Sequence, residues 1–348
     1  MSGGESDKIC NVGSSTKSDD GVCEVIGQLQ NMSTADKDNN NISICANCGK
    51  EGANNTCNKC MKVKYCNAVC KKVHKKKHKK DCEEHIRLAT EKHNEELRIA
   101  AELHEEKIFE EPPSQHGDCP ICFLRIPNLN TGWKYQTCCG KIICSGCIHA
   151  PVYDNQGNLV KKLCPFCRVP TPTSKEEIIE MMKKRMEKDD PIAIYNLGCD
   201  YFHGTNGYPQ DLTKALELFH RAGELGHAMA YSIIGYAYHC GRGVKRDSKK
   251  ASYYYELAAM AGNVTARYNL GANEDVAGNM DRAIKHYMIA ARGGLSLSTK
   301  RIKELYTDGT VTKECYTKAL KVYQEYLEEI KSKQRDEAAA ADEEDRYY

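Results

Sequence analysis

The chain has 348 residues and a formal net charge of +2, so net charge by itself points to no class of partner. Its length suggests two or three domains. No apolar run approaches the roughly 18 residues that a transmembrane helix needs, and the polar start at residues 1–5 is unlike a secretory signal peptide. We therefore expect no membrane span and an intracellular protein, cytoplasmic or nuclear.

The 20 cysteines are the most informative feature of the composition. In a secreted protein they would suggest disulfides. Here CxxC pairs dominate and the start of the chain does not look like a secretion signal. Both observations favour metal ligation in a reducing compartment.

Residues 1–44 are rich in Ser, Asp, Asn and Gly and contain few large apolar residues. Such a segment cannot bury enough apolar surface to offset the loss of chain entropy, so we expect it to be disordered. Cys10 and Cys23 show no pairing pattern there, and we expect free thiols.

A first cluster of metal-binding residue types spans 45–82. Its seven thiols and one imidazole suit two zinc ions, because each structural zinc ion takes four such ligands. In chain order they are Cys45, Cys48, Cys57, Cys60, Cys66, Cys70, His78 and Cys82.

The order and spacing of these residues resemble those of the MYND finger, over all 38 residues of the module. The resemblance implies one zinc ion for Cys45, Cys48, Cys66 and Cys70 and a second for Cys57, Cys60, His78 and Cys82. His74 is a rival for His78, but it lies one turn too far from Cys82 for the family pattern.

MYND fingers generally bind short, often proline-containing peptides. In this chain, His74 and Lys75 stand where the family commonly carries an acidic residue and a Trp. The resemblance to the family therefore gives only a weak expectation of ordinary peptide recognition.

Nine lysines and no acidic residue lie between positions 61 and 80. Such a run can bind nucleic acid or act as a nuclear localisation signal. We favour a solvated helical face and expect no nucleic-acid binding, because no aromatic residues are interleaved for base stacking. Residues 83–112 then predict a charged linker helix, which Pro112 and Pro113 end.

The densest cysteine cluster lies in the next module, at 113–173. It contains eight cysteines and few large apolar residues, so metal binding rather than a conventional core is expected to stabilise it. The cysteines are Cys119, Cys122, Cys138, Cys139, Cys144, Cys147, Cys164 and Cys167.

This pattern resembles a RING finger, in which the first and third ligand pairs share one zinc ion and the second and fourth pairs share another. The resemblance implies one site from Cys119, Cys122, Cys144 and Cys147 and a second from Cys138, Cys139, Cys164 and Cys167. Lys141 stands in the usual histidine position and cannot ligate, so we expect Cys138 to replace that ligand.

In RING fingers that act as ubiquitin ligases, an apolar residue inside the first CxxC contacts the ubiquitin-conjugating enzyme, and Ile121 has that position. Many of these fingers also carry a Pro after the seventh ligand and an Arg just past the eighth, and Pro165 and Arg168 match these positions. In the family, that Arg bridges the conjugating enzyme and ubiquitin. Between Cys147 and Cys164, turn residues replace the family's short helix. Trp133 is either a displaced contact or core.

Residues 174–330 contain internal repeats, which are strong over about 190–294 and weak over 295–330. Similar segments begin at Ala193, Ala230 and Ala266, and each unit ends in an Ala-x3-Gly pattern. The period predicts a helix-turn-helix solenoid with capping helices. The pattern resembles Sel-one-like repeats, relatives of the tetratricopeptide repeat that usually bind proteins. A capping box starts at Ser174, and residues 331–348 are expected to form a charged tail.

The sequence thus predicts a multidomain protein with two small zinc-stabilised cross-brace fingers joined by a helix, then an all-α helix-turn-helix solenoid. Four zinc ions are expected, two per finger. We interpret the chain as a RING-type ubiquitin ligase whose solenoid and MYND modules recruit protein substrates or partners, with a ubiquitin-conjugating enzyme as a further partner. A non-enzymatic interaction adaptor is the alternative. The substrate, the conjugating enzyme and the oligomeric state are open.

Overall fold

The computed structural model describes residues 44–347, except 130, 152, 154–155 and 157–162. The described residues form two compact units, which we call the first unit, up to Glu106, and the second unit, from Lys107. The disordered segment expected at 1–44, with Cys10 and Cys23, lies outside the described residues except for residue 44. Among the described helices, none combines the length and the apolarity needed to cross a membrane.

The first unit contains a small antiparallel ribbon of β1 (Asn55–Thr56) and β2 (Lys64–Tyr65), followed by the long helix α2 (Ala68–Phe109), whose last three residues belong to the second unit. The linker helix expected at 83–112 is therefore the later part of a helix that begins inside the first finger. The side chain of Asn67 caps its start by accepting a hydrogen bond from the amide of Cys70 at 2.9 Å.

The second unit opens with a small zinc-finger module. Its hairpin pairs β3 (Trp133–Gln136) with β4 (Lys141–Cys144), and the short helix α3 (Ser145–His149) follows directly. Trp133 is half-buried and packs against the core of this module, and its indole N–H donates to the carbonyl of Leu129 at 2.6 Å.

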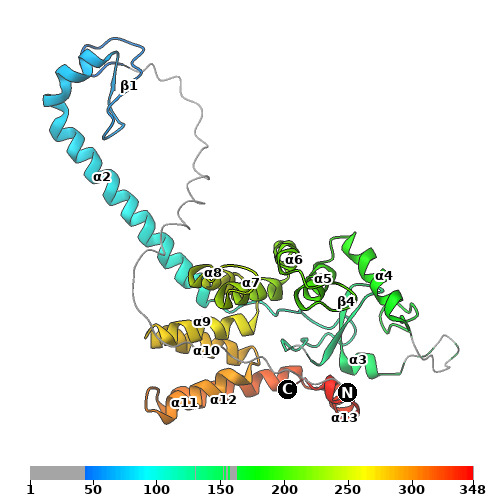
Figure 1. Cartoon of the computed structure of the whole chain (residues 1–348). Coiled ribbons are helices and arrows are strands. Elements are labelled where there is room, and N and C mark those ends of the chain that lie inside the picture. Colours follow the sequence, from blue (N-terminus) through cyan, green and yellow to red (C-terminus); the bar gives the residue numbers. More distant parts are fainter. Residues whose placement is uncertain (1–43, 130, 152, 154–155, 157–162, 348) are drawn as a thin grey trace. The chain divides into compact units, whose positions relative to one another are not determined.

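Helices then stack in chain order, from green to orange in Figure 1. They are α4 (Lys175–Met186), α5 (Pro191–His203), α6 (Leu212–Glu224), α7 (Ala228–Cys240), α8 (Ser248–Met260), α9 (Val264–Val276), α10 (Met280–Arg292), α11 (Ser296–Thr307) and α12 (Lys313–Ile330). The capping box predicted at Ser174 is confirmed, because its side chain and that of Glu177 cap each other's backbone amides.

Each repeat packs an aromatic ring of its second helix against a glycine of its first helix. A methyl group added at Gly198, Gly235 or Gly271 would lie 2.7–2.8 Å from the ring of Phe219, Tyr255 or Tyr287. The small residue at this repeated position therefore allows the two helices to approach closely.

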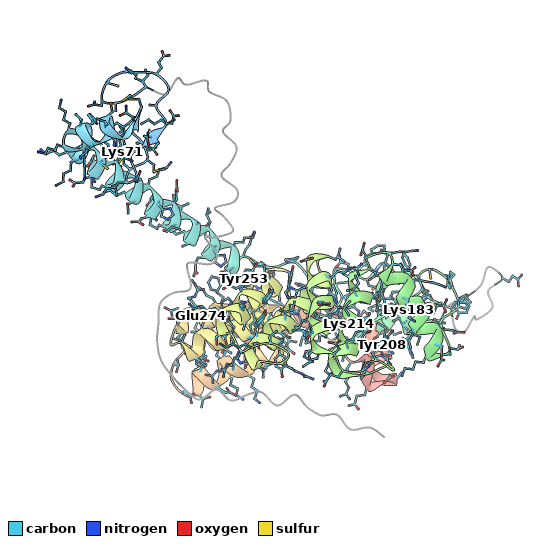
Figure 2. All side chains as sticks on the ribbon, turned by 45° about the horizontal axis from the view of Figure 1, so that its top comes forward. Lys71, Lys183, Tyr208, Lys214, Tyr253 and Glu274 are labelled. Carbon is cyan, nitrogen blue, oxygen red and sulfur yellow. The ribbon has the colours of Figure 1, made fainter. Side chains whose placement is uncertain are left out.

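A second repeated contact joins the end of the first helix of a repeat to the start of the second. The ammonium group of Lys214 lies 4.3 Å from the centre of the Tyr201 ring, and that of Lys250 lies 5.5 Å from the Tyr238 ring. In the third repeat an ion pair of 2.7 Å between Arg282 and Glu274 takes this place. Figure 2 labels Lys214 and Glu274.

The C-terminal segment differs from the charged tail expected at 331–348. It forms the helix α13 (Lys333–Ala341) and the short 3-10 helix η2 (Glu343–Asp345), and α13 packs against α3 of the zinc-finger module (Figure 1). Gly146 has no room for a side chain there, because a methyl group would lie 2.8 Å from the amide nitrogen of Arg335. The sequence of α13 is alanine-rich and charged, which is typical of a solvated chain end, but packing against α3 orders this segment.

Arg335 holds this C-terminal segment in place. Only 1% of the residue is exposed. Its guanidinium donates hydrogen bonds to the carbonyls of Leu124, Arg125 and Ile330, at 2.6–3.3 Å. One buried side chain therefore connects the zinc-finger module, the end of α12 and α13.

We expect Arg335→Ala to destabilise the zinc-loaded second unit by roughly 2–4 kcal/mol, because three carbonyls lose a charged donor in a buried place. The measurement is the thermal unfolding midpoint, together with the rate of proteolysis after residue 331. The matched control is Arg346→Ala, which removes only a surface ion pair with Glu343 and should cost about 0–0.5 kcal/mol. Equal midpoints for the two variants would contradict the anchoring role of Arg335.

Candidate metal centres

Four of the CxxC pairs adopt the same tight turn. In each, the residue after the second cysteine donates its amide to the carbonyl of the first, at 2.9–3.0 Å. That residue always has a left-handed backbone: Gly49, Met61, Phe123 and Arg168, with φ between 52° and 74°. The turn directs both thiols of a pair to one side, as chelation requires.

Amide hydrogen bonds and neighbouring thiols shift the acidity of these cysteines. Burial acts to raise the pKa of Cys45, but amides of Cys66, Asn47 and Cys48 outweigh it and lower the pKa to about 6. In the second finger, a hydrogen bond from Cys144 lowers the pKa of Cys119 to about 4, although burial opposes the shift. The same bond raises the pKa of Cys144.

One thiol in such a pair ionises at the expense of its neighbour, because two thiolates in contact repel each other. Four thiolates become compatible only around a cation. The acidity of the clusters therefore fits a divalent metal ion that binds thiolates.

In the first finger, the structure brings together two groups of four ligand atoms, each within 4.8 Å of one another. The groups are Cys45, Cys48, Cys66 and Cys70, and Cys57, Cys60, His78 and Cys82. The sulfur atom of Cys66 lies 3.5 Å from that of Cys70 and 3.6 Å from that of Cys48. A zinc ion holds tetrahedral sulfurs about 3.8 Å apart, whereas a disulfide needs about 2.05 Å.

The structure distinguishes the two candidate histidines. Nε2 of His78 lies 3.3 Å from the sulfur of Cys60, inside the second group. Nδ1 of His74 instead shares a hydrogen bond of 3.3 Å with the hydroxyl of Tyr65. His78 therefore has the position of a ligand, and His74 supports the finger from one turn away.

In the second finger, the structure forms the two groups that the RING resemblance implies: Cys119, Cys122, Cys144 and Cys147, and Cys138, Cys139, Cys164 and Cys167. The sulfur of Cys138 lies 3.4 Å from that of Cys167, and the sulfur of Cys139 lies 3.9 Å from that of Cys164. Lys141 is exposed on β4. The adjacent pair Cys138 and Cys139 thus places both of its sulfur atoms in the second group.

The tight hairpin turn explains how adjacent cysteines reach one site. The amides of Cys139 and Gly140 both donate to the carbonyl of Gln136, and Gly140 has a left-handed φ of 70°. Gly140 also needs to be small, since a methyl group there would lie 2.7 Å from the carboxylate of Asp190.

The first solenoid helices hold this turn. Arg185 on α4 donates to the carbonyls of Thr137 and Cys138 at 3.0 and 2.6 Å. Tyr135 donates to Asp190 at 2.8 Å, and the other oxygen of Asp190 caps α5. Sequence reasoning missed both solenoid residues. Asp190 precedes Pro191 and is recognisable as a helix cap, but no local signal indicates its partner in the finger.

The three residues expected to act in ubiquitin transfer all lie on the CxxC turns of the second finger. Ile121 is half-buried and packs against the core of the second finger, and Pro165 is half-buried. Arg168 is exposed, and its guanidinium donates to the carbonyl of Tyr153 at 3.3 Å. The turns expected between Pro151 and Asn158 lie largely outside the described residues.

An open cavity of about 370 Å³ lies between this finger and the first repeat. Its lining is mainly apolar and comes from β3, α4, α5 and the loop after α5; Figure 2 labels Lys183 and Tyr208. Further lining residues include Tyr135, Ile178, Met182, Asn196, Leu197 and Asp200.

Comparison with known families identifies two of the three modules. A MYND finger matches residues 45–82, and Sel1 repeats match residues 191–227, 228–263 and 265–295. The chain therefore has a zinc-binding, cysteine-rich N-terminal region followed by an all-helical Sel1 solenoid. Modules of both kinds generally mediate protein–protein interactions, which supports such a role for this chain.

Two curated relatives match over 97 residues each. An ERAD-associated E3 ubiquitin-protein ligase component, HRD3B, of Arabidopsis thaliana is 33% identical over 28% of this chain. Chitin synthase regulatory factor 3 of Schizosaccharomyces pombe is 29% identical over 26% of it. The chain spans only 15% and 10% of the length of these relatives.

Among solved structures, a Sel1 repeat protein from Oxalobacter formigenes is 26% identical, with 49% of this chain and 71% of that chain covered and a TM-score of 0.39. The antigen c5321 of uropathogenic Escherichia coli is 29% identical, with coverages of 47% and 35% and a TM-score of 0.37.

We expect native mass spectrometry of the reduced protein to count four zinc ions per chain, because four tetrahedral ligand groups are present. Cys138→Ser should drop to three ions in the presence of a mild chelator, since a hydroxyl is a poor zinc ligand. Cys315→Ser, a half-buried solenoid cysteine outside the groups, should keep all four. Identical counts for the two variants would remove Cys138 from the ligand set.

Proposed function

We propose that this protein is a RING-type ubiquitin ligase that works without a covalent intermediate. The second finger would bind a ubiquitin-conjugating enzyme that carries ubiquitin as a thioester. Catalysis would come from positioning, because holding the thioester in a reactive pose lowers the entropic part of the barrier. The solenoid and the MYND finger would bring protein substrates or partners.

The observation that carries this proposal is the position and exposure of Arg168. This residue directly follows the last expected ligand of the second finger, has a left-handed backbone and is exposed. A guanidinium presents five donors in a planar fork and can bridge two proteins through carbonyl groups. Its hydrogen bond to Tyr153 uses one of these donors.

The apolar surface around the turns supports the same reading. Phe123, next to the ligand Cys122, is 78% exposed, and Phe166, inside the fourth pair, is 43% exposed. We infer that these two exposed aromatic side chains contribute to the surface that binds the conjugating enzyme. Ile121 would then contribute the apolar contact expected of it, with Pro165 beside Phe166.

The recruiting role rests on the repeats. One relative is described as a component of an E3 ubiquitin-protein ligase, which is consistent with a repeat protein that serves such an assembly. The cavity between β3 and α4 lies beside the second zinc site. A substrate held there would be close to the finger that receives the conjugating enzyme.

A non-enzymatic adaptor is the second candidate, and one contact favours it. Helix α13 packs on α3, the short helix that follows Cys144. A finger covered in this way has lost part of its free surface to its own chain. Lys141 in the usual histidine position also departs from the ligase pattern.

An assay of self-ubiquitylation with a panel of conjugating enzymes distinguishes the ligase from the adaptor. We expect the zinc-loaded wild type to form conjugates, and Arg168→Ala to reduce the rate at least tenfold while conjugating-enzyme binding changes little. Ile121→Ala should weaken that binding itself. The different effects follow because Arg168 acts on the bound thioester and Ile121 on docking.

Arg221→Ala is the matched control, since it removes an exposed arginine on α6 that pairs with Asp189. It should leave the rate within about twofold of wild type. Absence of conjugates with every conjugating enzyme, in a sample with full zinc content, would refute the ligase and leave the adaptor.

A further inference from the structure

The metal ligands decide which way the first four turns of α2 face. Cys70, His78 and Cys82 point toward the metal groups of the first finger, with His74 between them against Tyr65. Positions four residues apart lie on one side of a helix. Residues offset by about half a turn must therefore point away from the finger.

Five residues form this outward stripe, which we call the basic face: Val69, Lys72, Val73, Lys76 and Lys80. All five are exposed. Val69, Val73, Lys76 and Lys80 follow one another at steps of three and four residues, and Lys72 lies beside Val73, so the stripe runs along the helix for about 16 Å. Lys77 and Lys79 flank it and are also exposed.

Charge on this surface is not neutralised within the finger. Residues 52–80 contain ten lysines and no acidic residue. Among the described residues, none of the lysines of the basic face forms an ion pair. Farther along the same helix the situation is different, since Arg87 and Arg98 each pair with two glutamates.

Lys71 shows what a structural lysine looks like in this finger. Its ammonium donates to the carbonyl of Thr56 and the side chain of Asn58, at 2.5 and 2.6 Å (Figure 2 labels Lys71). The lysines of the basic face make no such contact in the described residues.

Helix stability does not explain the basic face. Like charges four residues apart repel, and lysines near the start of a helix face the positive end of its dipole. The metal centres leave a small negative charge, since three or four thiolates surround each divalent ion. That charge lies on the inner side of the helix. The charge pattern therefore opposes folding and points to a partner.

The two valines indicate the kind of partner. Val69 is 69% exposed and Val73 is 63% exposed, one turn apart toward the N-terminal end of the basic face. The charged sugar–phosphate backbone of a nucleic acid offers no apolar surface that would cover two valines. The basic face also has no aromatic residue on which bases could stack. A polypeptide that combines carboxylates with apolar side chains complements both features.

We propose that the basic face binds an acidic, amphipathic polypeptide segment, whose apolar side chains cover Val69 and Val73 and whose carboxylates reach Lys72, Lys76 and Lys80. The partner binds as a helix or extended strand along α2. This interaction is independent of ubiquitin transfer and does not need the second finger.

The test uses the zinc-loaded full chain and a labelled 20-residue probe, a Glu-rich helix with leucines at every third or fourth position, read by fluorescence anisotropy. Lys72→Glu, Lys76→Glu and Lys80→Glu together should weaken binding at least tenfold at 100 mM salt. Val69→Ser with Val73→Ser should weaken it three- to tenfold at every salt concentration. Zinc content and helicity confirm that each variant is folded.

Three exposed solenoid lysines, Lys300, Lys303 and Lys313, provide the control, because changing them to Glu alters net charge equally and should leave affinity within twofold. A probe of the same composition with its leucines scrambled should bind several-fold more weakly. Equal binding of the scrambled probe, tighter binding of a DNA or RNA duplex, or no effect of the valine pair would overturn the proposal.

Discussion

The central constraint on this protein is that, among the described residues, sixteen cysteine and histidine side chains that could bind metal meet in four groups of four, with the candidate ligand atoms of each group within 4.8 Å of one another. Thiolates that close repel each other unless a cation lies between them. The fingers contain few large apolar residues, so a bound ion contributes folding energy that a small core cannot supply. The repeated CxxC turns, with their left-handed residues, exist to present thiols in this geometry.

In the second finger, metal binding and repeat packing depend on each other. The turn that carries Cys138 and Cys139 is held by Arg185 from the first solenoid helix, and Asp190 binds the hairpin while it caps α5. At the far end of the chain, Arg335 ties α13 to the carbonyls after Cys122. The second finger is thus an integral part of the second unit and not a separate domain joined to it by a linker.

This arrangement has a functional consequence. A finger that is packed into a solenoid presents its exposed turns in a defined relation to the repeats. An enzyme bound at Ile121 and Arg168 and a protein bound near α4 would then meet with little loss of orientational freedom, which is the way a positioning catalyst works. An adaptor would use the same arrangement to hold two proteins together.

Spacing alone determined most of the local features, because chelation and helix packing repeat at short sequence distances. The CxxC pairs, the choice of His78 over His74 and the Ala-Gly repeats were all visible in the sequence. The start of α2 at Ala68 and the helix α13 were not. Arg185, Asp190 and Arg335 are ordinary charged residues in the sequence. Only tertiary structure brings their partners in the second finger near, from positions 47 to 211 residues away.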